Sequence, residues 1–371
     1  MIICYLINIM EFKVRHSNKD ITIPRADFNV DRYLDHTTIV LGPGGTGKST
    51  AITHIVTEIQ DHLAALFVVN PTNPIKHDYD GMTPPQAIFP SFDRDWLEKL
   101  KMRQEAAAAT YTQAMDIDVL QKIFNKIATR GQRERLTQIQ DGFDDLIGEL
   151  SGTRKDDLEA THKRNVRKYM RGVIRPHKER IMDQLEDMDD PPEDISYTME
   201  YLDFNPRVCV VFDDCTVSLR PFVSNNRDAL FGDIFYRCRH FFLSIIICLH
   251  DDKILDSDYK RNSYQIIFTT NVVAQGFFER ASSNFSSYQK GLSRKVIKII
   301  YDKDARYRKL LYQREADYQF QHYTAEKIDK DDKEMVGSEF FQELCEGSGR
   351  KAGKLYFPQG NDYSDMFKIN P

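Results

Sequence analysis

The sequence contains no apolar run that approaches the ~20 residues of a membrane-spanning helix; its longest, residues 241–249, has the length of a strand. Positive charge is not in excess either, because 51 lysines and arginines stand against 56 aspartates and glutamates, a formal net charge of −5. Residues 1–10 are apolar but short and lack the basic start of a signal peptide, and Met10 is an alternative start to Met1. We therefore expect a soluble, non-secreted protein without a membrane span, whose contacts with nucleic acid come from a local basic patch.

Cysteine is scarce and shows no pattern that indicates a metal site or a disulfide framework. The six cysteines form no CxxC pair and have no zinc-like spacing, and disulfide frameworks usually occur in much smaller secreted chains. We expect reduced thiols throughout, in a cytosol-like compartment: Cys4, Cys209, Cys215, Cys238, Cys248 and Cys345.

Apolar runs of strand length alternate with helical periodicity and predict an α/β fold around a parallel sheet. Thr37–Leu41 is a β-branched run that ends in glycines, residues 49–63 carry apolar side chains at a spacing of three and four, and residues 66–69 form a second run. Residues 96–188 are helical in pattern and strongly charged, which indicates a long helical insertion in the α/β core. The later strand patterns are Val208–Phe212, 242–249, 265–269 and 296–301, the last with a hairpin partner at 306–312.

The glycine-rich segment after Leu41 matches GxxxxGK[ST], the Walker A phosphate loop. Glycines are required where a Cβ would keep polyphosphate from the backbone or where φ must be positive, and the following helix points its partly positive N-terminus at the phosphates. Lys48 is placed to reach the β- and γ-phosphates, and the Ser49 hydroxyl to bind Mg²⁺. We therefore expect ATP and Mg²⁺ as ligands, although the sequence does not distinguish ATP from GTP; the alternative is a glycine-rich turn without a ligand. The expected nucleotide-binding residues are Gly42, Pro43, Gly44, Gly45, Thr46, Gly47, Lys48, Ser49 and Thr50.

Two acids follow the apolar run Val208–Phe212, which has the pattern of a central parallel strand buried on both faces. In open α/β sheets the ligand lies outside the carboxyl ends of the strands, where these acids would fall. Asp213 would hold Mg²⁺, and Asp214 would polarise the attacking water. The alternative is a pair of turn or N-cap aspartates, which are common after strands.

These residues resemble the poxvirus-type genome-packaging ATPases of large DNA viruses, relatives of the FtsK/HerA DNA pumps. The resemblance rests on the phosphate loop, the Phe-Asp-Asp strand end, Arg239-His240 before the apolar run 242–249, and then Arg261-Asn262. It implies a ring of copies that pulls double-stranded DNA into a capsid, with a capsid or portal-vertex protein as a further partner, in the host cytoplasm (virus factory) or in the virion.

The resemblance also implies a domain organisation. A RecA-like P-loop ATPase core would be discontinuous, over residues 35–75 and 200–312. Around it we expect N-terminal strands in residues 1–34, the charged helical insertion in 76–199, and a polar C-terminal extension in 313–371.

Two positions depart from the pattern of this family. The family often has glutamate after the first acid, where this chain has Asp214, which is one methylene shorter. The next strand usually ends in a glutamine or asparagine that senses the γ-phosphate, and that place holds His250. A histidine can donate a hydrogen bond, but its charge varies near neutral pH. The alternative role of His250 is to cap the next turn.

An arginine from outside the loop would stabilise the charge that develops in phosphoryl transfer. Arg261 is the first candidate and Arg280 the second, because both follow core strands where a neighbouring subunit could dock. The alternative for each is a solvated arginine or an ordinary ion pair.

Two groups of basic residues are candidates for DNA contact. The first group lies on one face of a predicted helix and consists of Arg164, Lys168, Arg171, Arg175 and Lys178. The alternative is a solvated helix whose basic residues pair with the acidic run 183–194. The second alternates with apolar residues, and its alternative is an ordinary solvent-facing sheet surface; its members are Lys295, Lys298, Arg306, Arg308 and Lys309.

Together with the phosphate loop and the acidic strand end, the resemblance implies an ATP-driven motor that translocates double-stranded DNA. A related helicase or plasmid-transfer pump would share the ATP chemistry, and strand displacement would distinguish it. A second alternative is an ATP-dependent switch whose helical insertion binds a protein partner.

Overall fold

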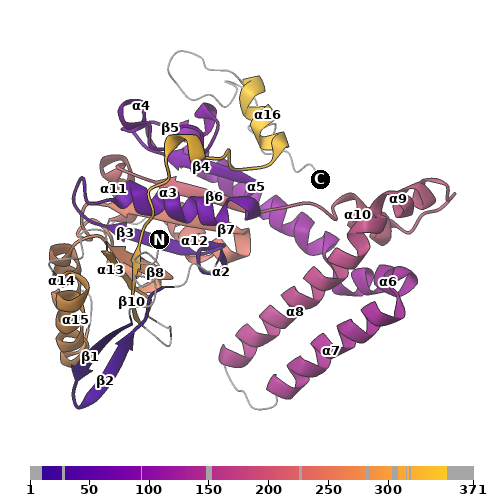
Figure 1. Ribbon diagram of the computed structural model, residues 1–371. Coiled ribbons are helices and arrows are strands. Elements are labelled where there is room, and N and C mark those ends of the chain that lie inside the picture. The colour runs from indigo at the N-terminus through magenta and orange to yellow at the C-terminus, as the bar shows by residue number, and fades with distance from the viewer. Residues whose placement is uncertain are drawn as a thin grey trace. The chain divides into compact units, whose positions relative to one another are not determined.

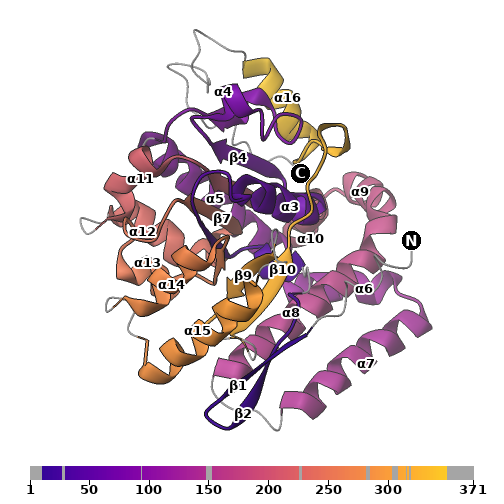
Figure 2. The same ribbon diagram turned by 60° about the vertical axis from the view of Figure 1, so that its left-hand side comes forward.

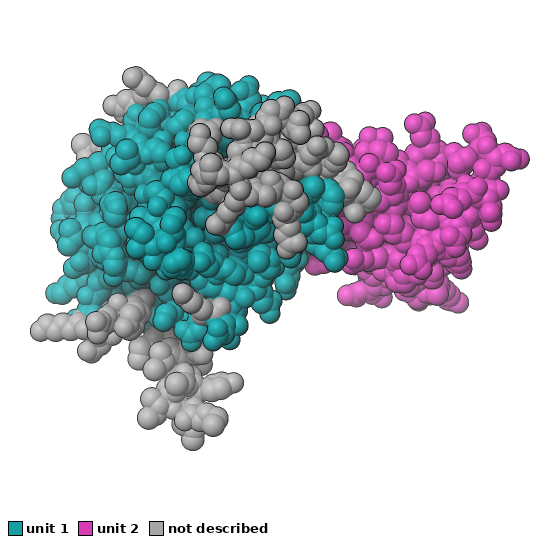
Figure 3. All heavy atoms as spheres, turned by 90° about the horizontal axis from the view of Figure 1, so that it is seen from above, with its two compact units in different colours: residues 1–105, 206–368 teal, residues 106–205, 369–371 magenta. Residues whose placement is uncertain are grey.

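The computed structural model describes residues 11–348 except 27–29, 93, 148–152, 225–227, 281–284, 303–307, 315 and 317–318. These residues form two compact units (Figure 3): unit 1 contains residues up to 105 and from 206 onwards, and unit 2 contains residues 106–205. Unit 2 therefore begins later than residue 76, where the sequence placed the start of the insertion. The reason is that the helix around Trp96, Leu97 and Leu100 is buried in the main core of unit 1.

The core of unit 1 is an eight-stranded sheet in the order β10-β9-β8-β3-β7-β6-β4-β5 (Figure 1). Six neighbouring strands, from β8 to β5, are hydrogen-bonded in parallel. Strand β9 runs antiparallel to its two neighbours, β8 and β10, so β10 has the same direction as the parallel strands. This confirms the predicted α/β fold around a mainly parallel sheet. The strands are β3 (Thr37–Leu41), β4 (Ala65–Val69), β5 (Ile88–Phe89), β6 (Val208–Phe212), β7 (Leu243–Leu249), β8 (Gln265–Phe268), β9 (Arg308–Tyr312) and β10 (Phe320–Thr324). A separate hairpin pairs β1 (Phe12–His16) with β2 (Lys19–Ile23).

Both faces of the sheet are covered, which explains why its parallel strands are continuously apolar. Helix α3 (Lys48–Ile59) packs on one face of the sheet, in one apolar cluster with the strand residues Val40, Val68 and Val211. The strand residues that alternate with these belong to a larger apolar cluster on the other face. The helices of unit 1 are α2 (Val30–Tyr33), α3, α4 (Asn73–Lys76), α5 (Arg94–Ala114), α11 (Thr216–Val223), α12 (Ala229–Tyr236), α13 (Ser257–Asn262), α14 (Asn271–Glu279), α15 (Ser287–Ile300) and α16 (Glu339–Ser348). Helix α5 continues into unit 2.

Unit 2 is helical and has its own apolar core, which includes Leu120, Phe124, Met170 and Met199. Its helices are α6 (Ile117–Ile127), α7 (Arg130–Ile147), α8 (Thr153–Ile174), α9 (Lys178–Glu186) and α10 (Glu193–Glu200). The helical pattern read from the charged segment is confirmed.

The strand expected at residues 296–301 is wrong, because these residues end helix α15. Val296, Ile297 and Ile300 are buried at helical spacing, and a capping box of Ser286 and Gln289 starts the helix. Helix α15 packs beside β9 (Figure 2), and the hairpin partner of β9 is β10, which the sequence reading missed.

The five cysteines in the described part of the chain are buried and are not assigned to any disulfide, in agreement with the expected thiols, and Cys4 lies outside it. Among the described helices, none combines the length and the apolarity that a membrane crossing requires.

Gln104 links the two chain segments of unit 1, because it lies near the end of the first segment and donates hydrogen bonds to the second. Its buried amide donates to the carbonyl oxygens of Pro206 at 3.1 Å and Phe241 at 2.5 Å. A buried carbonyl that loses its donor costs free energy, because it has no water to replace it.

We expect Gln104→Met to lower the free energy of unfolding by about 1–3 kcal/mol, measured by urea denaturation. Met102→Gln on the same helix is the matched control, since Met102 is 63% exposed. Equal stability of the two variants would show that the Gln104 hydrogen bonds do not stabilise unit 1.

Candidate active site

The glycine-rich segment forms a tight loop between the end of β3 and the start of α3. Gly45 and Gly47 have φ values of +72° and +81°, in the left-handed region that disfavours other residues. Gly47 is the N-cap of α3 and provides no side-chain cap, so the first N–H groups of the helix remain open to a ligand. Left-handed residues in such a loop aim successive N–H groups at a common point, which is an anion-binding arrangement.

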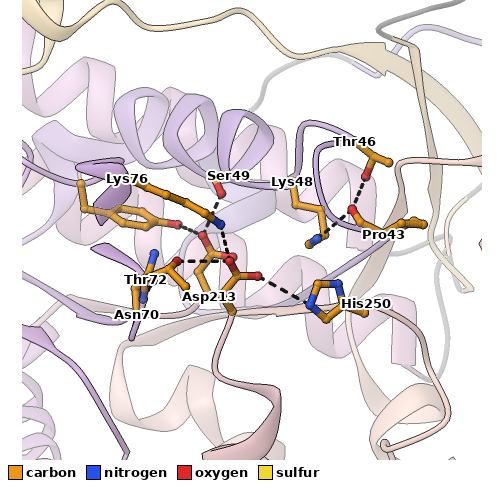
Figure 4. A network of polar contacts seen from close by, with 11 residues as sticks. Pro43, Thr46, Lys48, Ser49, Asn70, Thr72, Lys76, Asp213 and His250 are labelled. Carbon is orange, nitrogen blue, oxygen red and sulfur yellow. Dashed lines mark hydrogen bonds and ion pairs between the residues drawn. The ribbon is translucent and has the colours of Figure 1, made fainter. Parts of the chain in front are cut away.

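The side chains of the loop pack back onto it (Figure 4). Lys48 is 6% exposed, and its Nζ donates to the Pro43 carbonyl at 3.0 Å. Thr46 Oγ1 donates to the same carbonyl at 2.8 Å and lies 2.6 Å from the Thr269 hydroxyl at the end of β8. Any Cβ on Gly42 would lie 1.7 Å from Thr269 Oγ1, so this position requires glycine.

Asp213 follows β6 and faces the first turn of α3. Its Oδ2 accepts hydrogen bonds from Ser49 Oγ and from the Tyr79 hydroxyl, both at 2.9 Å (Figure 4). The side chain is buried, and its second oxygen, Oδ1, has no hydrogen-bond partner among the described residues. A buried carboxylate with an open oxygen beside a hydroxyl fits Mg²⁺, which prefers such oxygen ligands and keeps further sites for phosphate and water. The described residues contain no cluster of three acids, histidines or cysteines that could bind a metal unaided.

Asp214 has a different environment from its neighbour. Its backbone is left-handed, with φ of +52°, and its Oδ2 accepts from Lys76 Nζ at 2.5 Å and from Thr72 Oγ1 at 3.2 Å. Burial raises the pKa of Asp214, but the hydrogen bond and charge of Lys76, with help from Thr72 and Lys48, outweigh it, so the pKa lies below its usual value. The folded chain therefore holds this carboxylate ionised.

Strand β7 lies between β3 and β6, so the residue that follows it projects between the loop and the acids. That residue is His250, whose Nε2 lies 3.8 Å from Asp214 Oδ1. Figure 4 shows His250 on the side of the acids that faces Lys48. The geometry brings together four of the predicted site residues: Lys48, Ser49, Asp213 and Asp214, with His250 at their edge.

The loop after β4 contributes residues that the sequence reading missed. Tyr79 donates to Asp213, Lys76 pairs with Asp214, and burial followed by the nearby Asp213 charge raises the pKa of Asp78. The side chain of Asn73 stabilises this loop by accepting from Tyr79 N at 3.0 Å. No local sequence signal marks these residues, because the position of their loop follows from the pairing of β4 with β6, which places it at the sheet edge where the two acids lie.

The two candidate arginines form ion pairs within unit 1. Arg261 pairs with Asp258 inside helix α13, and Arg280 NH1 lies 2.5 Å from Oδ1 of the buried Asp252. Lys260 Nζ, at 3.0 Å, shares that carboxylate. A role of either arginine in a neighbouring copy stays a prediction.

The basic face of α8 is opposite Val166 and Met170, which are buried in the core of unit 2. The expected single helix is wrong at its end, because Arg175 and Lys178 lie beyond α8, which ends at Ile174. Arg175 and Lys178 pair with Asp203, at 2.8 and 3.1 Å, which is not in the acidic run 183–194. Lys168 is exposed.

The second basic group does not form one surface. Lys295 and Lys298 lie on helix α15, Arg308 stacks on Phe12, and Lys309 is 4% exposed. Arg306 lies outside the described residues. The group's expected alternation in a hairpin is wrong because its first half is helical.

No protein-family model matches the chain. The chain is 26% identical over 362 residues to "Uncharacterized protein B354L" of African swine fever virus, an alignment that covers 94% of this chain and 97% of the relative. Among solved structures it is similar to the genome packaging NTPase B204 from Sulfolobus turreted icosahedral virus 2 in complex with sulfate, at a TM-score of 0.32 and 10% identity over 75% of this chain and 91% of that one. It is also similar to the pCW3 conjugation coupling protein TcpA with ATPγS, at a TM-score of 0.35 and 12% identity over 88% and 68%.

We expect Lys76→Met to lower the thermal midpoint at pH 7 by about 1–3 °C, since Lys76 is half exposed. The pKa of Asp214 is lowered in the folded state, so its stabilisation is present above the ordinary value of 3.8 and is lost as the pH falls through the folded-state pKa. The difference from the wild type should therefore shrink in a series of melting curves as the pH is lowered below 3.8 and through the folded-state pKa of Asp214.

Lys327→Met is the control for this series, because that side chain is 83% exposed. A Lys76→Met difference that persists at the lowest pH would mean that the ion pair with Asp214 is not its cause.

Proposed function

We propose that the protein is a Mg²⁺-dependent ATPase that translocates double-stranded DNA and packages a viral genome into a capsid. One observation carries the proposal: Ser49 of the phosphate loop and Asp213 of the acidic strand end, far apart in sequence, form a hydrogen bond at 2.9 Å. Phosphoryl transfer from a nucleotide requires groups that bind phosphate and groups that hold a metal ion. At one sheet edge this chain has both: a loop with open N–H groups and a lysine, and a pair of an acid and a hydroxyl. The viral relative, aligned over nearly the whole chain, supports the viral setting.

In the proposed ATP hydrolysis each residue of the site has its own role. The loop N–H groups and Lys48 bind the phosphates, and the Ser49 hydroxyl and Asp213 hold Mg²⁺, which neutralises charge on the β- and γ-phosphates when bound. Asp214 orients a water and accepts its proton, while the water oxygen bonds to the γ-phosphorus and the bond to the β–γ bridging oxygen breaks. His250 beside Asp214 donates to a γ-phosphate oxygen.

The proposal includes a ring of copies, in which Arg261, or else Arg280, reaches the nucleotide of the neighbouring copy. A capsid or portal-vertex protein would anchor the ring, in the host cytoplasm (virus factory) or in the virion. An arginine supplied in this way lets one copy control hydrolysis in the next.

Lys48→Ala should lower the rate of ATP hydrolysis at least about a hundredfold, because the cation that faces the phosphates is lost. A phosphate-release assay with the full chain measures this, and Lys327→Ala is the matched control. A Lys48→Ala protein that hydrolyses ATP at the normal rate would refute the site.

Duplex DNA should stimulate hydrolysis, and the stimulation should fall steeply with salt, because phosphate contacts release counterions. If the duplex lies along α8, the double variant Lys168→Gln, Arg171→Gln should reduce the slope of log affinity against log salt by about 2. Fluorescence anisotropy of a labelled duplex across a salt series gives this slope.

The matched variant is Lys298→Gln on α15, which should leave the slope unchanged. Absence of stimulation across the whole salt series would favour the ATP-dependent switch, and displacement of one strand would favour a helicase.

A further inference from the structure

A second lysine reaches the phosphate loop, from the side opposite the acids. Lys309 Nζ donates to the Thr46 carbonyl at 2.7 Å, and any Cβ on Gly47 would lie 3.1 Å from the same nitrogen. The side chain comes from β9, which is not among the parallel strands that end at the site.

The register of the sheet explains how β9 delivers this side chain. Strand β9 is antiparallel to β8 and sets Leu310 opposite Phe268, which puts Lys309 opposite Thr269, at the edge where the parallel strands end. Lys309 shares a strand face with Leu311, which packs in the same cluster as helix α3. An antiparallel strand thus begins where its parallel neighbours end, beside the N-terminus of α3.

Lys309 is a buried cation without a matching carboxylate. It is 4% exposed, and among the described residues it forms no ion pair; its contact is the neutral Thr46 carbonyl. Burial lowers the pKa of Lys309 to about 8. A buried ammonium without a carboxylate is costly, and the negative charge of a polyphosphate in the loop would lessen that cost.

The contact also fixes the direction of one peptide unit. The peptide bond is planar and trans, so the Thr46 carbonyl and the Gly47 N–H point in opposite directions. Because Lys309 draws the carbonyl toward β9, the Gly47 N–H must point away from β9.

We infer that Lys309 is a positioning residue of the phosphate loop: by holding the Thr46 carbonyl it aims the Gly47 N–H at the phosphates of the bound nucleotide, and its ammonium adds to their attraction. This inference rests on the proposed function, because it requires a nucleotide in the loop. It replaces the reading of Lys309 as a DNA contact, which its burial excludes.

The test is the affinity of the full-length variant Lys309→Met for ATPγS and ADP with Mg²⁺, measured by isothermal titration calorimetry. Methionine keeps the length of the buried stem and removes the charged donor, so both dissociation constants should rise about tenfold or more. Lys309→Arg restores a cationic donor and should recover most of that loss. Hydrolysis at saturating ATP should change less than the Michaelis constant, because the positioned N–H acts on binding.

Arg308→Met is the matched control, since Arg308 precedes Lys309 on the same strand and its NH1 donates to Ile300 O at 3.3 Å. Thermal melting without nucleotide shows whether Lys309 only stabilises the fold. A lower melting midpoint of Lys309→Met with unchanged dissociation constants would overturn the inference. Equal losses of affinity in Arg308→Met and Lys309→Met would do the same.

The outcomes also separate this inference from the proposed function. Binding by the wild type that Lys48→Ala abolishes and Lys309→Met leaves intact would contradict the role of Lys309 alone. Failure of the wild type to bind either nucleotide would overturn both.

Discussion

The hydrogen bond between Ser49 and Asp213 is the interaction on which the site depends, because it joins two segments separated by 164 positions. Neither segment can form a nucleotide site alone: the loop lacks a carboxylate, and the strand end lacks a phosphate cradle. The parallel sheet solves this problem, since β3 and β6 run in the same direction with β7 between them and end at one edge. A helical unit can therefore be inserted between the two segments without disturbing their meeting point.

The two adjacent acids differ because different elements surround them. The partners of Asp213 are neutral hydroxyls, of Ser49 and Tyr79, which leave its charge for a cation to balance. Asp214 already has an ammonium partner in Lys76, and its backbone is left-handed. Adjacent carboxylates in unlike environments can hold different roles, one as a metal ligand and the other as a proton acceptor. The loop after β4, which supplies both Tyr79 and Lys76, thus decides the chemistry of both acids.

Local patterns predicted the parts of the fold and site that depend on nearby residues. The phosphate loop, the acidic strand end and the cysteine thiols could be predicted from a motif, an apolar run and a spacing. Lys76 and Tyr79 could not be found in this way, because their loop has no periodicity and its position follows from the pairing of β4 with β6. Residues 296–301 were misread because Val296, Ile297 and Ile300 are β-branched; the start signal of their helix, Ser286 and Gln289, lies ten residues earlier. Lys309 was interpreted as a surface residue because its position at the loop follows from the register between β8 and β9, which the sequence alone does not show.

The lysines and the acids lie on different sides of the site, and this arrangement indicates which charges the ligand carries. On one side Lys48 and Lys309 rest on the carbonyls of Pro43 and Thr46, so two buried ammonium groups have no carboxylate partner among the described residues. On the other side Asp213 forms no ion pair in the part of the chain that the structure describes, and its charge raises the pKa of Asp78. Uncompensated buried charge is costly in either sign. A polyphosphate with its Mg²⁺ carries the opposite pattern, negative toward the lysines and positive toward the acids, so a single ligand relieves both costs at once.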